Sequence, residues 1–278
     1  MADAHRRLVV TSDDLGMTLA VNRGIEAALA CGALTGTNIM VPCPWFEHAA
    51  RSFARTPADL GVHFTLTCEW ANYTWRPLTQ AASLLDSEGR MHRTIAALME
   101  HARADDIRAE CRAQLALALR RGLPINYVDV HMCIPLLESR GGQLHAVNSG
   151  HEMALMRIVE AVGREFGLEY PYALDGERLR HFQSALSISG KGREAVERYI
   201  DALAPGLHHL SCHCALETAE QCELSPGDSA EYPWSSPYRL DDYATVTSPW
   251  FAALLRSRGI ELAGMPWSNR SLPARARA

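Results

Sequence analysis

Short apolar runs alternate along the chain with longer stretches in which apolar residues recur about every 3.6 positions. The short runs are typical of buried strands, and the longer stretches are typical of helices that bury one face. This alternation predicts an α/β fold in which parallel strands are joined by right-handed helical crossovers. The predicted strands are 8–12, 37–41, 60–66, 125–131, 170–174, 207–212 and 260–263.

The clearest predicted helix covers residues 105–121. Ile107, Cys111 and Leu115 fall on one face of this segment, and the Gly-Leu-Pro that follows is typical of a helix end. Similar apolar spacing predicts three more helices, at 20–31, 152–166 and 241–257.

Composition limits the number of domains and the kinds of partner. A chain of 278 residues with 47% hydrophobic content can bury a substantial core and lies within the range of one α/β barrel. Because the chain shows no internal repeat or linker, a single domain over residues 1–278 is expected. The net charge of -5, without a long basic block, gives no electrostatic reason to expect a nucleic-acid or membrane partner. A small or neutral partner is expected, and a homodimer stays open.

The first residues and the cysteines predict the compartment. The N-terminal segment leads into a short apolar run at 8–12, which is too short for the core of a signal peptide. No apolar stretch approaches membrane-spanning length. The eight cysteines are scattered along a chain large enough to fold without cross-links, so reduced thiols are expected rather than disulfides. These features predict a soluble, cytoplasmic protein.

Residues able to bind a metal or move a proton end several of the predicted strands. Asp13 and Asp14 follow the first strand, and His63, His131 and His213 lie at the ends of three others. The carboxyl ends of parallel strands meet on one face of an α/β fold, where such folds carry their chemistry. An aspartate and two histidines form a common ligand set for a divalent ion and leave one coordination position open for water. A hydrolase requires such an open position.

The aspartate pair and the histidines also have structural interpretations. The pair could cap the helix that begins near Met17, because a helix N-terminus favours a carboxylate. A lone histidine in a strand, such as His63, is more often a packed core residue than a ligand. The presence of such residues at several strand ends is what favours a metal site.

Strand parity separates two cysteines from this candidate site. A structural zinc site with the thiolates of Cys133, Cys212 and Cys214 as ligands is the alternative interpretation. In a strand, however, Cys212 and Cys214 point to the opposite face from His213. No C-x-x-C pair supplies the usual spacing of structural zinc ligands. Asp129 and Cys133 are expected on the side of their strand that carries the histidine, where Asp129 could orient a metal ligand.

Two long stretches, 67–92 and 215–240, show no regular pattern and each follows a candidate site residue. Loops of this length are usually functional or mobile. The first carries aromatic side chains that either anchor the loop as a small core or form a wall against a sugar ring, with polar neighbours in contact with the sugar. These aromatic and polar residues are Trp70, Tyr73 and Trp75, with Glu69, Asn72 and Arg76. Trp234 and Tyr238 in the second stretch are weaker candidates for the same role.

Several segments together carry a resemblance to a known family. They are T-S-D-D-L-G at 11–16, V-N-R-G-I at 21–25, G-A-L-T-G-T-N-I-M-V-P at 32–42, G-V-H-F-T-L-T at 61–67, V-D-V-H at 128–131, S-C-H at 211–213, and the pair Arg239 and Asp242. In these segments the chain resembles the YdjC-like carbohydrate deacetylases, also called the ChbG/HpnK fold. The resemblance covers nearly the whole chain and is most specific in the first 70 residues.

The resemblance implies an irregular (β/α) barrel of about seven parallel strands, similar to a TIM barrel, with long loops on the active-site face. It implies a metal-dependent hydrolase that removes an acetyl group from an N-acetylated sugar or oligosaccharide. In the implied reaction a metal-bound water attacks the acetyl group. Carried over by position, it implies Asp14, His63 and His131 as metal ligands, Asp13 as the general base and His213 as the general acid. One divalent ion is expected, zinc or magnesium first, with manganese, cobalt or nickel as alternatives.

The chain departs from the family pattern in two places. Cys133 stands where members commonly carry a second histidine, and Cys214-Ala215 stands where they carry Pro-Gly. Arg239, which matches the family's later arginine, is expected to bind substrate. Two other functions stay open, namely hydrolysis of another amide or an ester, and sugar binding by a catalytically silent protein of the same fold.

Overall fold

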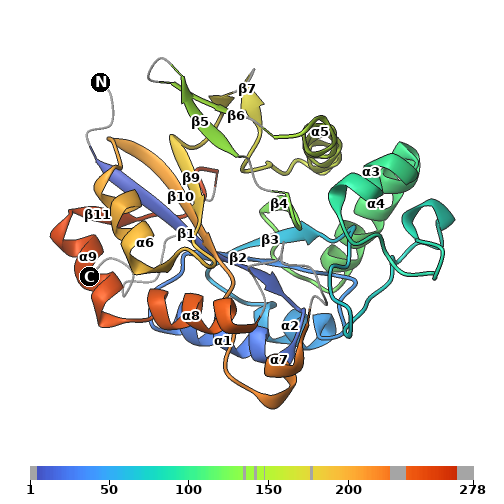
Figure 1. The fold of residues 1–278 in the computed structure, drawn as a ribbon, viewed down its shortest axis with the longest axis horizontal. Coiled ribbons are helices and arrows are strands. Elements are labelled where there is room, and N and C mark those ends of the chain that lie inside the picture. Colours follow the sequence, from blue (N-terminus) through green and yellow to red (C-terminus); the bar gives the residue numbers. More distant parts are fainter. Residues whose placement is uncertain are drawn as a thin grey trace.

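In its described part, the chain folds around a sheet of seven parallel strands that curls into a half-barrel (Figure 1). The computed structural model describes residues 5–133, 136–140, 143–146, 148–175, 178–225 and 236–267. The strand order is β4-β3-β2-β1-β10-β9, and β11 also pairs with β1. The strands are β1 (Arg6–Leu15), β2 (Gly36–Ile39), β3 (Asp59–Phe64), β4 (Tyr127–Val130), β9 (Ser184–Ser187), β10 (Gly206–Cys212) and β11 (Ile260–Leu262).

Two short antiparallel ribbons accompany the main sheet. One pairs β5 (Leu137–Arg140) with β6 (Gln143–Ala146), and the other pairs β7 (Leu174–Asp175) with β8 (Arg178–Leu179). The two ribbons contact each other through β6 and β8. They lie together at the top of the view in Figure 1.

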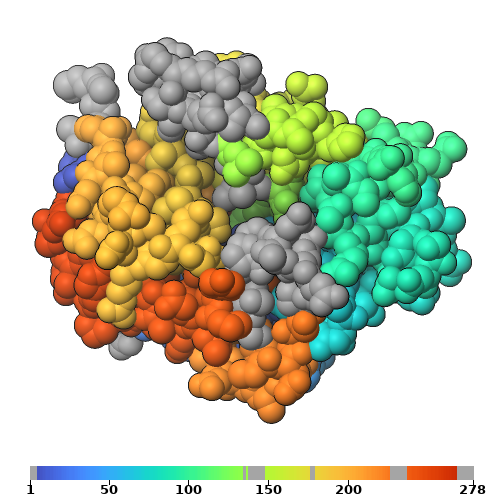
Figure 2. All heavy atoms as spheres, in the orientation of Figure 1, coloured from blue at the N-terminus to red at the C-terminus, as the bar shows by residue number. Residues whose placement is uncertain are grey.

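Helices pack around the outer side of the curled sheet (Figure 1). In the space-filling view, α3 and α4 lie on the opposite side of the molecule from α6 and α9 (Figure 2). None of the helices within the described ranges is long and apolar enough to cross a bilayer. The helices are α1 (Leu19–Ala30), α2 (Phe46–Phe53), α3 (Ile95–His101), α4 (Ala104–Arg120), α5 (Gly150–Glu165), α6 (Gly192–Asp201), α7 (Ala219–Glu223), α8 (Ser236–Val246) and α9 (Pro249–Ser257), with a 3₁₀ turn η1 (Ala82–Leu84).

The fold class predicted from the sequence is confirmed, and two predicted elements are wrong. Residues 170–174 form no strand of the sheet: the run contains Pro171, which lacks the N–H that a strand interior needs, and only Leu174 enters the small ribbon β7. The predicted helix 241–257 is two helices, because Ser248 caps α9 with its side chain and Pro249 begins it.

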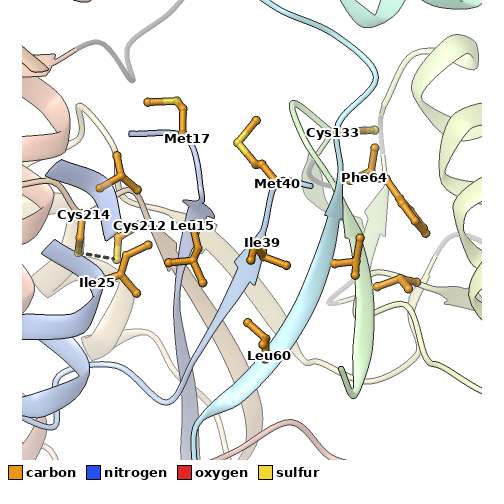
Figure 3. Packing of buried hydrophobic residues seen from close by; sticks show 14 of the residues in the cluster. Leu15, Met17, Ile25, Ile39, Met40, Leu60, Phe64, Cys133, Cys212 and Cys214 are labelled. Carbon is orange, nitrogen blue, oxygen red and sulfur yellow. Dashed lines mark hydrogen bonds between the residues drawn. The ribbon is translucent and has the colours of Figure 1, made fainter. Parts of the chain in front are cut away.

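A continuous apolar core fills the space between the sheet and its helices. Figure 3 shows Leu15 and Ile39 side by side on β1 and β2, with Leu60 lower on β3. Cys212 and Cys214 lie in the same core with their sulfur atoms 3.6 Å apart (Figure 3). All eight cysteines are free thiols, as expected from the sequence. Burying each aliphatic side chain contributes about 1.5–3 kcal/mol, so this core supplies much of the stability.

One close packing contact fixes the three strands that carry much of the candidate site. The Tyr127 ring on β4 lies directly over Gly61 on β3, and its hydroxyl donates a hydrogen bond to the Thr37 carbonyl on β2. A Cβ atom added at Gly61 would lie 2.4 Å from the Tyr127 ring. Only glycine therefore permits this approach, which holds the register of β2, β3 and β4.

Replacing Gly61 with alanine tests this contact. The added methyl group must displace a fully buried ring, so Gly61→Ala is expected to lower the free energy of unfolding by about 1–3 kcal/mol in urea denaturation. Gly150→Ala is the matched control, because a Cβ atom at Gly150 meets nothing within 4 Å. Equal stability of the two variants would show that the Tyr127 contact does not hold the strands.

Strand β10 carries a buried histidine, His209. His209 has one ring nitrogen 2.9 Å from the Thr11 hydroxyl and the other 2.9 Å from the Tyr172 hydroxyl, and it stacks on Phe182. Burial lowers the pKa of His209 to about 3. The native protein therefore holds this ring neutral.

The neutral His209 ring makes the stability depend on pH. Below pH 6.5 the unfolded chain binds a proton at this histidine, whereas the native state binds it only near pH 3. The free energy of unfolding is therefore expected to fall with decreasing pH, by up to about 1.4 kcal/mol per unit from this residue. His209→Gln should show a shallower pH slope in urea denaturation, and the exposed His151→Gln should keep the wild-type slope. A His209→Gln slope equal to that of the wild type would contradict this assignment.

Candidate active site

A cavity opens where β1, β3, β4 and β10 end. It is partly open to solvent. The carboxyl ends of parallel strands meet here, which is the face that the sequence predicted for the chemistry. The lining residues are Asp13, His63, Asp129, Val130, His131, Met132, Cys133, Tyr172, Ser187, Ser211 and His213.

Asp14, His63 and His131 converge beside this cavity. Their ligand atoms all lie within 4.8 Å of one another, and all three side chains are buried. Asp14 Oδ1 is 3.5 Å from His63 Nε2 and 3.1 Å from His131 Nδ1, and among the described residues it accepts no hydrogen bond. Ligand atoms around a four-coordinate ion with bonds of about 2.1 Å lie about 3.4 Å apart. The spacing and the buried, unbonded oxygen both fit a divalent ion.

Asp14 is held in place by its backbone and by a buried arginine. Its φ of 69° lies in the left-handed region, and the pairing of β1 with β2 shifts register at this point. Arg239 Nη2 donates to Asp14 Oδ2 at 2.6 Å, and neither side chain is exposed. Burial opposes ionisation of Asp14, but Arg239 and His131 outweigh it and hold the pKa of Asp14 well below its usual range. Thr18 caps α1, so neither aspartate of the pair has that role.

Glu69 orients His131 from the side opposite Asp14. The His131 Nε2 atom lies 3.0 and 3.2 Å from the two Glu69 carboxylate oxygens, which leaves Nδ1 directed at Asp14. Burial disfavours a charged ring, but Glu69 and Asp14 outweigh it and raise the pKa of His131 to about 10. An environment that stabilises a proton so strongly also suits a metal cation. The sequence indicated Glu69 only as a polar residue of the loop, because nothing in the pattern relates it to His131.

His63 has the complementary arrangement. Its Nε2 faces Asp14, and its Nδ1 lies 3.7 Å from Asp129 Oδ2, on the side where the sequence placed an orienting carboxylate. Burial lowers the pKa of His63 well below the ordinary value, so the ring is neutral. A neutral imidazole is the form that binds a metal.

Asp13 and Asp129 form a second carboxylate group at the cavity wall. The Asn38 amide donates to both, to Asp13 Oδ1 and to Asp129 Oδ2, each at 3.0 Å. Burial, followed by repulsion from Asp129 and Asp14, raises the pKa of Asp13 well above its usual range. Burial raises the pKa of Asp129 to about 7. Asn38 was part of a family motif but had no predicted role.

His213 faces Asp13 across the cavity. Its Nε2 is 3.9 Å from Asp13 Oδ2, and its side chain is 13% exposed. Its Nδ1 lies 2.8 Å from the Ser189 hydroxyl, and Asp242 accepts a hydrogen bond from both that hydroxyl and the His213 backbone N–H. Burial lowers the pKa of His213 to about 3. Ser189 carried no signal in the sequence.

The aromatic cluster of the first long loop lies mostly inside the protein. Trp70 and Trp75 are each 3% exposed, and Tyr73 donates its hydroxyl to the Met17 carbonyl. Arg76 is exposed, and Arg239 is buried over the Trp70 ring. None of these five residues lines the cavity. The burial of the two tryptophans is typical of side chains that anchor a loop, and contact of the five residues with a sugar stays a prediction. Trp234 lies outside the described residues, and Tyr238 is an exposed residue of α8.

The cysteines do not form a metal site in the described part of the chain. Cys133 lines the cavity, and its sulfur lies 3.8 Å from the Glu152 carbonyl oxygen. Cys212 and Cys214 point into the apolar core while His213 lines the cavity, which confirms the parity argument.

Comparison with known proteins places this geometry in a family. The sequence profile described as YdjC-like protein matches residues 7–257. A carbohydrate deacetylase of Thermus thermophilus is 31% identical over 253 residues, which cover 88% of each chain. A carbohydrate deacetylase of Brevibacillus brevis is 30% identical over 188 residues, 66% of this chain and 67% of that one.

A solved structure extends the comparison to the fold. The crystal structure of an Enterococcus faecalis protein described as a cellobiose-phosphate cleavage protein superposes with a TM-score of 0.73. The superposition covers 94% of this chain and 98% of that one, at 20% identity, and shows a shared fold. Because the family profile matches almost the whole chain, this protein belongs to the YdjC-like protein family.

Proposed function

We propose that this chain is a metal-dependent deacetylase that hydrolyses the acetamide of an N-acetylated sugar or oligosaccharide. The observation that carries the proposal is the convergence of Asp14, His63 and His131 beside a cavity that Asp13 and His213 also line. Relatives of 30–31% identity are named carbohydrate deacetylases, which supports the same chemistry here.

In this proposal Asp14, His63 and His131 hold the divalent ion. Such an ion lowers the pKa of water and polarises an amide carbonyl. Two imidazoles and one carboxylate accommodate zinc, magnesium, manganese, cobalt or nickel to different degrees, and imidazole favours zinc and the later transition metals. Behind the ligands, Glu69 orients the His131 ring at hydrogen-bond distance, and Asp129 lies 3.7 Å from His63 Nδ1.

Asp13 is the general base of the proposed reaction. Its carboxyl group lines the cavity, and the Asn38 amide fixes its orientation. Burial and the neighbouring carboxylates raise its pKa, so a proton taken from water is held more strongly than by an ordinary aspartate.

His213 is the general acid. An amine leaves poorly unless its nitrogen is protonated, so a second group must supply a proton as the C–N bond breaks. His213 Nε2 is 3.9 Å from Asp13 Oδ2, which supports a short route from the base, through the imidazole, to the leaving nitrogen. The low pKa of His213 means that the ring is neutral before this proton arrives.

The other cavity residues suit a sugar. Ser211 has a buried hydroxyl oxygen with no hydrogen-bond partner among the described residues, and Ser187 and Tyr172 line the same cavity. Sugar hydroxyl groups can donate to and accept from such side chains. These contacts support a hydroxylated substrate over an apolar amide.

Acetate release from N-acetylated mono- and oligosaccharides tests the proposed function. Asp13→Asn removes the base but keeps the size of the side chain, so turnover is expected to fall about 10²–10⁴-fold with the metal content unchanged. Asp105→Asn, on the exposed first turn of α4, is the control and should keep full turnover. Acetate release only from esters or other amides would favour the alternative hydrolase. If the wild type binds these sugars but hydrolyses none of the substrates, the result would instead support a catalytically silent sugar-binding protein.

The role of Glu69 can be tested by metal binding alone. Glu69→Gln keeps the hydrogen-bond acceptor for His131 but removes its charge, and is expected to weaken divalent-ion affinity about 10- to 100-fold in competition with a chromophoric chelator. Glu110→Gln is the matched control, because Glu110 is equally buried and binds the loop amides of Leu78 and Thr79. Equal affinity in the Glu69→Gln variant and the wild type would remove Glu69 from the site.

A further inference from the structure

A serine outside the predicted site lies against the candidate acid. Ser189 occupies the turn after β9 and is 6% exposed. The turn is fixed to β10, because the Ile188 N–H donates to the Ser211 carbonyl at 3.0 Å, and the Lys191 N–H closes the turn on the Ile188 carbonyl. The backbone therefore presents the Ser189 side chain to the end of β10, where His213 follows.

The Ser189 hydroxyl lies between the His213 ring and a buried carboxylate. Its oxygen is 2.8 Å from His213 Nδ1 and donates to Asp242 Oδ2. The same Asp242 oxygen accepts the His213 backbone N–H at 2.7 Å. Through these two hydrogen bonds Asp242, which is 1% exposed, holds the main chain of His213 directly and its ring through Ser189.

The hydroxyl has only one hydrogen, and this decides where the His213 hydrogen lies. When Asp242 is ionised, its carboxylate only accepts hydrogen bonds, so the Ser189 hydrogen points to Asp242. The Ser189 oxygen must then accept from His213, which requires a hydrogen on Nδ1. In a neutral imidazole the other nitrogen then carries no hydrogen and can only accept a hydrogen bond. That nitrogen is Nε2, the one that faces Asp13.

We propose that Ser189 is a positioning residue that holds neutral His213 in the Nδ1–H tautomer, so that the Nε2 atom facing Asp13 carries no hydrogen. The inference rests on the proposed function only for the role of His213 as the acid. Nε2 takes up the proton that Asp13 has removed from water, while the Nδ1–H bond to Ser189 stays in place. Nε2 then gives this proton to the leaving nitrogen as the C–N bond breaks, and the nitrogen keeps the bonding electron pair. His213 returns to the same neutral tautomer.

Strands β9 and β10 contain another serine–histidine contact, in which the histidine hydrogen lies on Nε2 instead of Nδ1. Ser184 Oγ is also 2.8 Å from a histidine Nδ1, that of His208. The other nitrogen of His208 faces the Ala204 carbonyl at 2.8 Å, which accepts and therefore requires a hydrogen on Nε2. The Nδ1 atom of His208 therefore carries no hydrogen, whereas the Nδ1 atom of His213 carries one. Ser184 lies away from the cavity and provides a matched control.

Two measurements test the inference on the full-length protein. In ¹⁵N NMR spectra recorded above the pKa of Asp242, which burial raises to about 7, His213 is expected as the Nδ1–H tautomer and His208 as the Nε2–H tautomer. The His213 signal is identified by its loss in His213→Gln. In kinetics, Ser189→Ala is expected to lower kcat about 10- to 100-fold with KM nearly unchanged, as part of the acid contribution. Ser189→Thr keeps the hydroxyl and should restore kcat, and Ser184→Ala should retain wild-type kcat.

The outcomes separate the inference from the proposed function. An Nε2–H tautomer of His213 in the wild type, or a wild-type kcat in Ser189→Ala, would overturn the role of Ser189. A wild type without deacetylase activity but with the Nδ1–H tautomer would uphold the hydrogen arrangement and overturn only the proposed reaction. Equal losses of kcat in Ser189→Ala and Ser189→Thr would also count against the hydroxyl as the active group.

Discussion

The site depends on one break in the alternation of strand β1. In a regular strand, successive side chains point to opposite faces, so Asp13 and Asp14 could not serve one cavity. The register of β1 against β2 shifts between Ser12 and Leu15, and Asp14 takes a φ of 69°. This conformation costs on the order of 1–3 kcal/mol outside glycine and persists where surrounding contacts hold it. The break lets Asp14 join the two imidazoles while Asp13 faces the cavity.

The carboxylates of the site differ because their surroundings differ. Arg239 and His131 outweigh the effect of burial at Asp14 and keep it ionised, which its proposed role as a metal ligand requires. Asp13 and Asp129 share the single amide of Asn38, and burial raises the pKa of both. Buried acids with pKa values moved in opposite directions suit different roles, here the proposed roles of metal ligand and general base.

Parallel topology allowed the sequence to predict both the sheet and a cluster of site residues, whereas the resemblance to the family implied Asp14, His63 and His131 as the metal ligands. Apolar runs mark buried parallel strands, and parallel topology brings the ends of those strands together, so His63 and His131 could be placed near Asp14 without any contact being known. Strand β9 could not be predicted, because its Ser-Ala-Leu-Ser sequence carries no apolar run. Its side chains are only half-buried, so burial left no clear pattern.

The contacts that orient the site could not be predicted from periodicity. Glu69 reaches His131 from a loop, and Ser189 reaches His213 from a turn, so the positions of both depend on backbone paths without a repeat. Composition also could not separate the two interpretations of Trp75. An aromatic side chain in a loop suits a binding wall and a small core equally well, and only the packing of the loop distinguishes them.

Helix α8 joins the two halves of the site. Arg239 and Asp242 are three residues apart on this helix and so lie on one face. Arg239 binds the candidate ligand Asp14, and Asp242 holds the backbone of His213. Separating a buried ion pair costs about 3–5 kcal/mol, because each charge is left without its partner. Movement of α8 away from the sheet would break the Arg239 pair and release the His213 backbone, so the packing of one helix holds the proposed ligand Asp14 and the proposed acid His213 in place.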